Sequence, residues 1–245
     1  MLDGDHYIGD ELEIFREAIC WKKYFSRMLR PFIRGRVLEV GAGIGGTTSI
    51  LCNETVEEWI CLEPDPELAT TLQQLIVAQP QLGKCKVRTN FVRDLEKNQK
   101  FDAILYVDVL EHIEDDRAEL QQAMKHLATD GSLIVLSPAH QWLYSEFDKA
   151  IGHYRRYTKT SLLQLTPPGA SVRIARYLDS VGMVASAANR LMLSQSMPKR
   201  RQILFWDRCM VPISRLLDPL LTYSVGKSVI AIWTDGKGQR SSTST

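Results

Sequence analysis

The stretch that decides the fold is "RVLEVGAGIGG", residues 36 to 46. A short apolar run is followed by a turn with glycines at positions 41, 43, 45 and 46. A strand that ends in a glycine turn at the start of a helix brings free backbone N–H groups and a positive dipole end to one point. Glycines also let the backbone approach a ligand without an intervening Cβ. The stretch therefore predicts a site for a nucleotide-like ligand directly after this strand.

Outward from this strand, short apolar runs alternate with helical patterns. Five strands are expected, at residues 36–40, 58–63, 85–91, 101–108 and 132–138. Helices are expected between them, near residues 44–53, from about Pro64, and near 116–128. Such alternation indicates a parallel sheet with helices on both faces. Two late strands are expected at 171–178 and 227–234.

The remaining segments are expected to surround this sheet. Residues 10–30 read as one amphipathic helix, with apolar side chains at Ile14, Ala18, Trp21, Phe25 and Met28. A helical stretch at 180–225 contains Pro212, which should kink or interrupt it. We expect one domain, residues 1–234, followed by a disordered tail (235–245). Within the domain, residues 1–34 should form an N-terminal helical cap, and the segments 139–170 and 180–225 should form a lid over the binding site.

Composition sets limits on the class of protein. The chain has 245 residues, of which 44% are hydrophobic, with a net charge of +1. This length allows a full-sized core, and the near-neutral balance predicts no nucleic-acid partner. Five cysteines without a C-x-x-C pair favour a reducing, cytoplasmic location. The N-terminus shows no signal peptide, and no apolar run is long enough to span a bilayer.

The glycines fit two ligands. Gly41, Gly43 and Gly46 have the G-x-G-x-x-G spacing of a dinucleotide site, whereas Gly41, Gly43 and Gly45 give G-x-G-x-G. No lysine follows Gly46, which excludes a P-loop. Three features favour S-adenosylmethionine (SAM) over NAD. They are the carboxylate of Glu39 before the glycines, a 35-residue leader before the strand, and the acid-rich "YVDVLEHIEDD" after the fourth strand.

Three motifs carry a family resemblance. "VLEVGAGIGGTT", "CLEPDPEL" and "FDAILYVDVLEHI" resemble, in order and spacing, the class I SAM-dependent methyltransferases over residues 30 to 138. The loop "PAHQWLYSEFDKAIGHYRRYTK" resembles a loop of a bacterial subgroup of these enzymes that acts on small molecules or in sugar pathways. The resemblance implies a Rossmann-like α/β fold with a seven-stranded, mostly parallel sheet and a late antiparallel pair. It also implies SAM as cofactor and S-adenosylhomocysteine (SAH) as product.

The resemblance assigns a cofactor role to eleven residues. The methionyl end of SAM would contact Glu39 and the turn Gly41, Ala42 and Gly43, while Asp108 and Val109 would face the sulfonium and the methionyl chain. Glu63 would bind the ribose hydroxyls. The adenine would lie against Pro64, Asn90, Phe91 and Val92. Many relatives carry Gly-Asp or Gly-Thr in place of Asn90-Phe91, so this chain departs from the family pattern there.

Methyl transfer to an alcohol requires a base, and three histidines are candidates. A sulfonium methyl is already activated, so positioning supplies most of the catalysis, whereas an alcohol must also lose a proton. His153, His112 and His140 are the candidate bases, although His112 also suits a structural role. A metal alternative uses Asp108, Glu111 and His112, which form a D-x-x-E-H run. No resident metal ion is expected.

The acceptor pocket is expected to contain aromatic and basic side chains. Tyr154, Arg155, Arg156 and Tyr157 suit a carboxylate or phosphate on the acceptor, or a structural loop in which an arginine pairs with Glu146 or Asp148. Trp206 is expected to line the pocket. Arginines at 201, 208 and 215 give the 180–225 helices a basic side, which could rest on an anionic membrane. A lid or a homodimer face is the favoured alternative.

The function expected from the sequence is SAM-dependent transfer of a methyl group to oxygen or nitrogen of a small-molecule acceptor by in-line displacement. A sugar or lipid-linked acceptor is the alternative within this class. An NAD-dependent oxidoreductase and a non-catalytic subunit with the SAM fold are the alternatives outside it. Stable membrane insertion is not expected.

Overall fold

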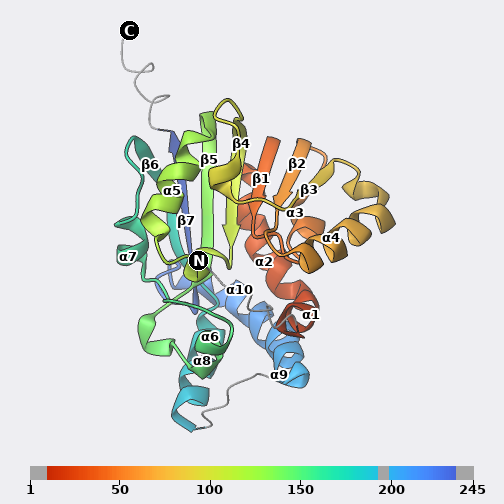
Figure 1. Cartoon of the computed structure of the whole chain (residues 1–245). Coiled ribbons are helices and arrows are strands. Elements are labelled where there is room, and N and C mark those ends of the chain that lie inside the picture. Colours follow the sequence, from red (N-terminus) through yellow and green to blue (C-terminus); the bar gives the residue numbers. More distant parts are fainter. Residues whose placement is uncertain (1–9, 193–198, 236–245) are drawn as a thin grey trace.

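A computed structural model of the chain describes residues 10–192 and 199–235 (Figure 1). Its centre is a seven-stranded sheet in the order β3-β2-β1-β4-β5-β7-β6. The strands are β1 (Gly35–Val40), β2 (Val56–Leu62), β3 (Cys85–Arg88), β4 (Phe101–Val107), β5 (Leu127–Pro138), β6 (Ala170–Leu178) and β7 (Ser228–Asp235). The first five pair in parallel, and β7 runs antiparallel to both β5 and β6. The predicted fold class is confirmed.

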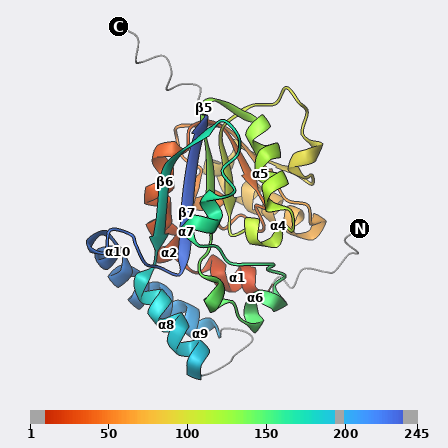
Figure 2. The ribbon, with the colours of Figure 1, turned by 90° about the vertical axis from the view of Figure 1, so that its left-hand side faces the viewer.

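Helices cover both faces of the sheet (Figures 1 and 2). They are α1 (Asp10–Arg16), α2 (Ile19–Leu29), α3 (Thr48–Leu51), α4 (Pro66–Ala78), α5 (Asp116–Lys125), α6 (Glu146–Ala150), α7 (Lys159–Leu163), α8 (Ser180–Met192), α9 (Arg200–Phe205) and α10 (Val211–Leu220). No helix in these two ranges is long and apolar enough to cross a membrane.

Alternation along the strands divides the core into two layers. On β1, Val37 packs in the layer that contains α2 and α4, whereas Leu38 and Val40 pack in the layer with α5 and α7. All three are almost completely buried. Because successive side chains of a strand point to opposite faces, a parallel sheet buried on both sides requires such a continuous apolar run. Each fully buried aliphatic side chain contributes about 1.5–3 kcal/mol.

The helix predicted over residues 10–30 is interrupted, so that prediction is wrong in one respect. It divides into α1 and α2 at Glu17 and Ala18. The Lys22 ammonium donates to the carbonyls of Phe15 and Arg16 at 2.7 and 3.0 Å, which satisfies the end of α1. At the start of α2, the Asp207 carboxylate accepts hydrogen bonds from two backbone N–H groups. Tertiary contacts therefore stabilise the break.

Smaller differences lie at element ends. The strand predicted at 85–91 stops at Arg88, and the helix predicted near 44–53 is the single turn α3. In the 180–225 stretch, α9 and α10 are joined by a π-helical segment, Trp206–Met210, and Pro212 lies in the first turn of α10. Because a proline ring clashes with the carbonyl four residues earlier, a wider turn directly before it is the expected accommodation. The predicted tail after Asp235 lies outside the described residues.

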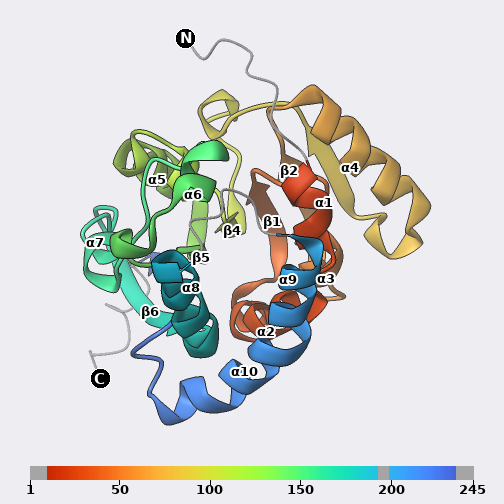
Figure 3. The same cartoon turned by 90° about the horizontal axis from the view of Figure 1, so that it is seen from below.

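The carboxyl ends of the five parallel strands meet at one edge of the sheet. This edge points downward in Figure 1, where α1, α6, α8 and α9 lie beneath it. Figure 3 looks onto the same edge from below and shows these helices arranged around it. Ligands of open α/β sheets bind outside the carboxyl ends of the strands. The fold therefore brings the residues that follow β1, β2, β3 and β4 to one place.

Candidate active site

The glycine turn after β1 decides between the two spacings. Gly41, Gly43 and Gly45 have φ values of +65°, +54° and +81°, whereas Gly46 is not in this left-handed region. A Cβ at Gly41 would lie 2.7 Å from Val109 Cγ2, and one at Gly45 would lie 2.6 Å from side chains of α4. The backbone and its packing therefore require glycine in the G-x-G-x-G pattern.

Glu63, which follows β2, holds the glycine turn. Its carboxylate accepts hydrogen bonds from the backbone N–H of Gly43 at 2.7 Å and of Asp65 at 3.0 Å. Burial raises the pKa of this carboxyl, although the two backbone hydrogen bonds act in the opposite direction. The side chain is 5% exposed. A carboxylate is thus fixed between the ends of β1 and β2, within reach of whatever the turn binds.

Glu39, two residues before the turn, is buried in the interior. One carboxylate oxygen accepts from the Thr48 hydroxyl at 2.6 Å and from the Trp59 indole N–H at 2.8 Å. Burial raises the pKa of Glu39 to about 7, even though both hydrogen bonds lower it. This carboxyl therefore connects β1 to α3 and β2, and in this structure it is engaged in structural contacts.

Asp108 follows β4 and has a left-handed backbone, with φ of +54°. Its side chain is exposed, yet the surrounding protein raises its pKa to about 6. The nearby charges of His153, Lys227 and Lys22 act in the opposite direction. Val109, the next residue, packs against Gly41, the first glycine of the turn. Asp108 and the adjacent Val109 are thus placed at the carboxyl edge beside the glycine turn.

The residues expected at the adenine lie just after β3. Phe91 is exposed, with the Arg93 guanidinium 4.3 Å from the centre of its ring. Asn90 is exposed as well, whereas Val92 is buried and packs in the core. Pro64 is exposed directly after Glu63. An exposed aromatic ring at this position suits the flat face of an adenine base.

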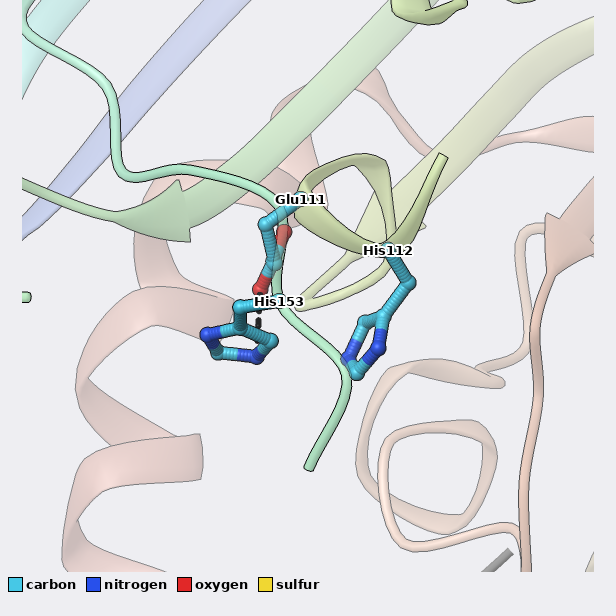
Figure 4. Close-up of side chains that lie close together, drawn as sticks. All are labelled: Glu111, His112 and His153. Atoms are coloured by element: carbon cyan, nitrogen blue, oxygen red, sulfur yellow. Dashed lines mark ion pairs between the residues drawn. The ribbon is translucent and has the colours of Figure 1, made fainter. Parts of the chain in front are cut away.

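The structure brings two of the three candidate histidines together with Glu111 (Figure 4). The rings of His112 and His153 lie 4.5 Å apart, and His153 Nε2 lies 3.9 Å from Glu111 Oε1. One donor atom from each of the three residues falls within 4.8 Å of the others. His140 is separate from them and stacks on Tyr177. Asp108, which the metal alternative included, is replaced in this group by His153.

Glu111 is an unusual member of this group. The side chain is fully buried, and neither carboxylate oxygen has a hydrogen-bond partner among the described residues. Burial raises the pKa of Glu111 well above its ordinary value, and the charge of Asp108 raises it further. Three such donors could form part of a metal site, a role in which the carboxyl must be ionised.

Asp148 fixes the orientation of His153. The imidazole Nδ1 lies 2.9 Å from Asp148 Oδ1, and Arg156 binds both oxygens of the same carboxylate at 2.7 and 2.9 Å. Burial alone would raise the pKa of Asp148, but the hydrogen bonds from His153 and Arg156 hold it well below its usual value. An ionised carboxylate can only accept, so Nδ1 carries a proton and donates it to Asp148.

The basic loop has structural partners for both arginines. Arg156 binds the carboxylate just described, which was one of the two pairings expected. Arg155 donates to Asp116 at 2.7 Å, and the buried Tyr157 hydroxyl donates to the same carboxylate at 2.8 Å. Tyr154 is exposed. These contacts favour the structural interpretation of Arg155, Arg156 and Tyr157 and leave Tyr154 as the member of the set that is open to an acceptor.

Trp206 is an interior residue rather than a free pocket wall. Its indole N–H donates to Asp179 at 2.6 Å, and the Lys227 ammonium lies 3.7 Å from the centre of its ring. Lys227 and Lys22, whose charges act on Asp108, could not be identified from the sequence. Lys22 falls in an ordinary amphipathic pattern and Lys227 precedes a strand, so no local signal marks either residue. Their position depends on the packing of α2 and β7 at the edge of the sheet.

Two hollows in the described part of the surface contain none of the predicted site residues. The larger has a volume of about 700 Å³ and lies between α1 and α9. It is lined by Glu13, Ile14, Arg16, Glu17, Ile19, Arg200 and Arg208. The candidate site is therefore defined by the residues that meet at the sheet edge.

Comparison with known proteins gives the family. Residues 13–168, well over half of the chain, match the model of the methyltransferase domain family. The chain belongs to this family, and its fold and glycine turn are those of a class I SAM-dependent methyltransferase. The choice between hydride and methyl transfer is thus decided in favour of methyl transfer. No curated protein is similar to the chain in sequence.

Solved structures share the fold at low identity. Coclaurine N-methyltransferase bound to N-methylheliamine and SAH has a TM-score of 0.60 at 12% identity, over 88% of this chain and 72% of that one. A SAM-dependent methyltransferase from Clostridium acetobutylicum has a TM-score of 0.59 at 12% identity, over 94% and 96%. The protein bound to the Trm112 methyltransferase activator in a Haloferax volcanii complex has a TM-score of 0.62 at 12% identity, over 94% and 96%.

Proposed function

We propose that the chain transfers the methyl group of SAM to an oxygen or nitrogen of a small-molecule acceptor, with His153 as the base when the acceptor is a hydroxyl. The observation that carries this proposal is the Asp148–His153 pair: His153 Nδ1 lies 2.9 Å from Asp148 Oδ1, which leaves Nε2, 3.9 Å from Glu111 Oε1, as the ring nitrogen that could take a proton. A sugar or lipid-linked acceptor is the alternative within the class. Its supporting feature is the same loop, residues 139–160.

The cofactor would be held by the ends of β1, β2, β3 and β4. The glycine turn, where no Cβ stands in the way, would border the methionyl chain, and the carboxylate of Glu63, which holds the turn, would accept from the ribose hydroxyls. Asp108 would face the positive charges of SAM, and Phe91 would stack on the adenine. SAM supplies an activated sulfonium methyl, so the protein needs to orient the acceptor and accept a proton.

The proton would move to His153. If the acceptor is a hydroxyl, His153 Nε2 would take the proton that the hydroxyl loses, while bound SAM would supply the activated methyl group. The imidazolium would be balanced by Asp148, whose pKa is held well below its usual value by His153 and Arg156. Arg156 acts through Asp148 as a positioning residue.

The test measures cofactor binding and turnover separately. Glu63→Ala should weaken SAH binding about 10- to 100-fold in calorimetric titration, because one or two charge-assisted hydrogen bonds are lost. Glu57→Ala, on the exposed surface of β2, is the matched control and should bind normally. Unchanged SAH affinity in Glu63→Ala, with native circular dichroism, would contradict the site.

Turnover is measured as labelled methyl transfer from SAM to a panel of small alcohols, phenols and sugars. His153→Ala should reduce transfer to alcohols about 10²- to 10⁴-fold and leave SAH affinity unchanged. The control for the loss of a buried histidine is His126→Ala. His126 lies at the end of α5, where its imidazole forms a hydrogen bond with the Gln99 carbonyl. Normal turnover in His153→Ala would move the role of base to His112 or His140.

A further inference from the structure

The outer side of α10 is apolar and uncovered by the described residues. Leu216, Leu220 and Ile213 are 67%, 78% and 49% exposed. At 100° per residue these three side chains lie on one side of the helix. Phe205, at the end of α9, is 57% exposed. We call the exposed side of α9 and α10 the outer face of α9–α10. It comprises these apolar side chains and the exposed cations Lys199, Arg200, Arg201, Arg208 and Arg215.

Charges in this helical segment are sorted by side. Its exposed ionisable groups are all positive: Lys199, Arg200, Arg201, Arg208 and Arg215. Its two acids are buried. Asp207 accepts from the start of α2, and Asp218 accepts from Tyr24 and from the start of α8. Arg200 is the one cation of the five with an ion pair among the described residues, with Glu17. The outer face therefore presents leucines together with net positive charge.

The exposed leucines do not belong to a lid over the candidate site. The opposite side of the segment, with Trp206, Val211 and Ser214, is the one that packs inward. A lid would direct its apolar residues toward the acceptor. Figure 3 shows α9 and α10 at the rim of the carboxyl edge, beside α1 and α8. Within residues 10–192 and 199–235, the outer face thus serves neither the packing of the core nor the proposed chemistry.

The charge pattern distinguishes the occupants of this face. In a symmetric dimer the same cationic patch lies on both partners, so two sets of arginines would be brought together, and like charges are unfavourable there. An anionic bilayer offers apolar chains to the leucines and phosphates to the arginines. On α10, Arg215 lies about 100° around the helix axis from Leu216, and its long side chain can extend past the apolar side toward the headgroups.

We propose that the outer face of α9–α10 binds the surface of an anionic phospholipid bilayer. The leucines would insert at the level of the headgroups while the chain stays on one side of the membrane. This contact would place the carboxyl edge of the sheet close to the bilayer. The inference goes beyond the proposed methyl transfer and does not depend on it.

The test is sedimentation of the full chain with vesicles, without SAM or acceptor. We expect binding to vesicles of phosphatidylcholine with 30% phosphatidylglycerol, and little binding to phosphatidylcholine alone. Since each basic residue near an anionic surface contributes about five-fold in affinity, Arg208→Gln/Arg215→Gln should reduce partitioning roughly 20- to 30-fold. Leu216→Ser/Leu220→Ser should reduce it at least about ten-fold. Raising the salt to 0.5 M should weaken binding of the wild type.

Matched controls lie elsewhere on the surface. Val77→Ser removes an equally exposed apolar side chain from α4, and Arg117→Gln/Lys125→Gln removes two exposed cations from α5. These variants should bind as the wild type does. Equal binding to both vesicle types, no binding, or equal losses in the control variants would overturn the proposal. So would a concentration-dependent dimer in light scattering that Leu216→Ser/Leu220→Ser converts to monomer, because the face would then be an interface between copies.

Discussion

Asp108 shows how a single residue connects the backbone to the chemistry. Its left-handed φ is uncommon outside glycine and is tolerated best by Asp and Asn. This conformation turns the chain at the end of β4 and leaves the carboxyl in an exposed but partly desolvated position. Such residues gather at functional sites, where the surrounding structure enforces them. The same carboxyl is the negative group that a cationic cofactor would meet.

The raised pKa of Asp108 predicts a pH dependence for SAM binding. The carboxyl is charged above about pH 6 and neutral below it, so the attraction for SAM should be lost as the pH falls from 7.5 to 5. We expect SAM affinity to fall several-fold over this range by calorimetry. Asp108→Asn should bind SAM more weakly at pH 7.5 and show a smaller dependence. A slope identical to that of the wild type would contradict the role of Asp108.

Residues with local backbone roles were the ones that the sequence could predict. The glycines at 41, 43 and 45, and the carboxylate at 63, follow from what a strand-turn-helix needs. The pairing of Arg156 with Asp148 was one of two named options. The placement of Lys22 and Lys227 beside Asp108 was not predictable, because it depends on segments more than 80 residues away in the chain.

At the scale of elements, buried acids connect the helices at the edge of the sheet. Asp207 accepts from the N–H groups of Cys20 and Trp21 at 3.1 and 2.8 Å and so caps α2, whose own N-cap residue is an alanine. Asp218 accepts from the N–H groups of Asp179 and Ser180 at the start of α8. Helix starts leave backbone donors unsatisfied, and here carboxylates from another helix supply the acceptors.

Removal of one such acid should therefore destabilise the fold. Asp207→Ala leaves two buried N–H groups without an acceptor and should lower the free energy of unfolding by about 1–3 kcal/mol. The measurement is urea denaturation followed by circular dichroism. Glu96→Ala, on an exposed loop, should change it by less than about 0.5 kcal/mol. Equal values for the two variants would show that Asp207 does not cap α2.

The strands were predictable to within a few residues, while the helices of the rim were predictable only in part. Apolar runs buried on both faces identify parallel strands from local sequence alone. The break between α1 and α2 could not be predicted, since the acid that stabilises it lies 186 residues from Trp21. The π segment before Pro212 follows from a proline that the sequence does show, but its geometry depends on packing.

At the scale of the whole molecule, the fold determines where the cofactor would bind, at the carboxyl edge of the sheet. The acceptor would be bound by the segments that surround this edge. The two methyltransferase structures compared above share only 12% identity with the chain, so their likeness shows the fold alone. The 139–160 loop and the helices α8 to α10 surround the same edge, and they contain the base proposed above and the outer face of α9–α10 (Figure 3). We therefore expect these segments to determine the acceptor.

The most direct test of the account is calorimetric titration of the whole chain with SAH, with NADH as the comparator. The structure pairs a G-x-G-x-G turn with Glu63 and places Asp108 beside them, so we expect micromolar binding of SAH at about one site per chain. NADH, whose pyrophosphate would meet the carboxylates of this edge, should not bind. Binding of NADH in place of SAH would contradict the assignment of the glycine turn and of Asp108.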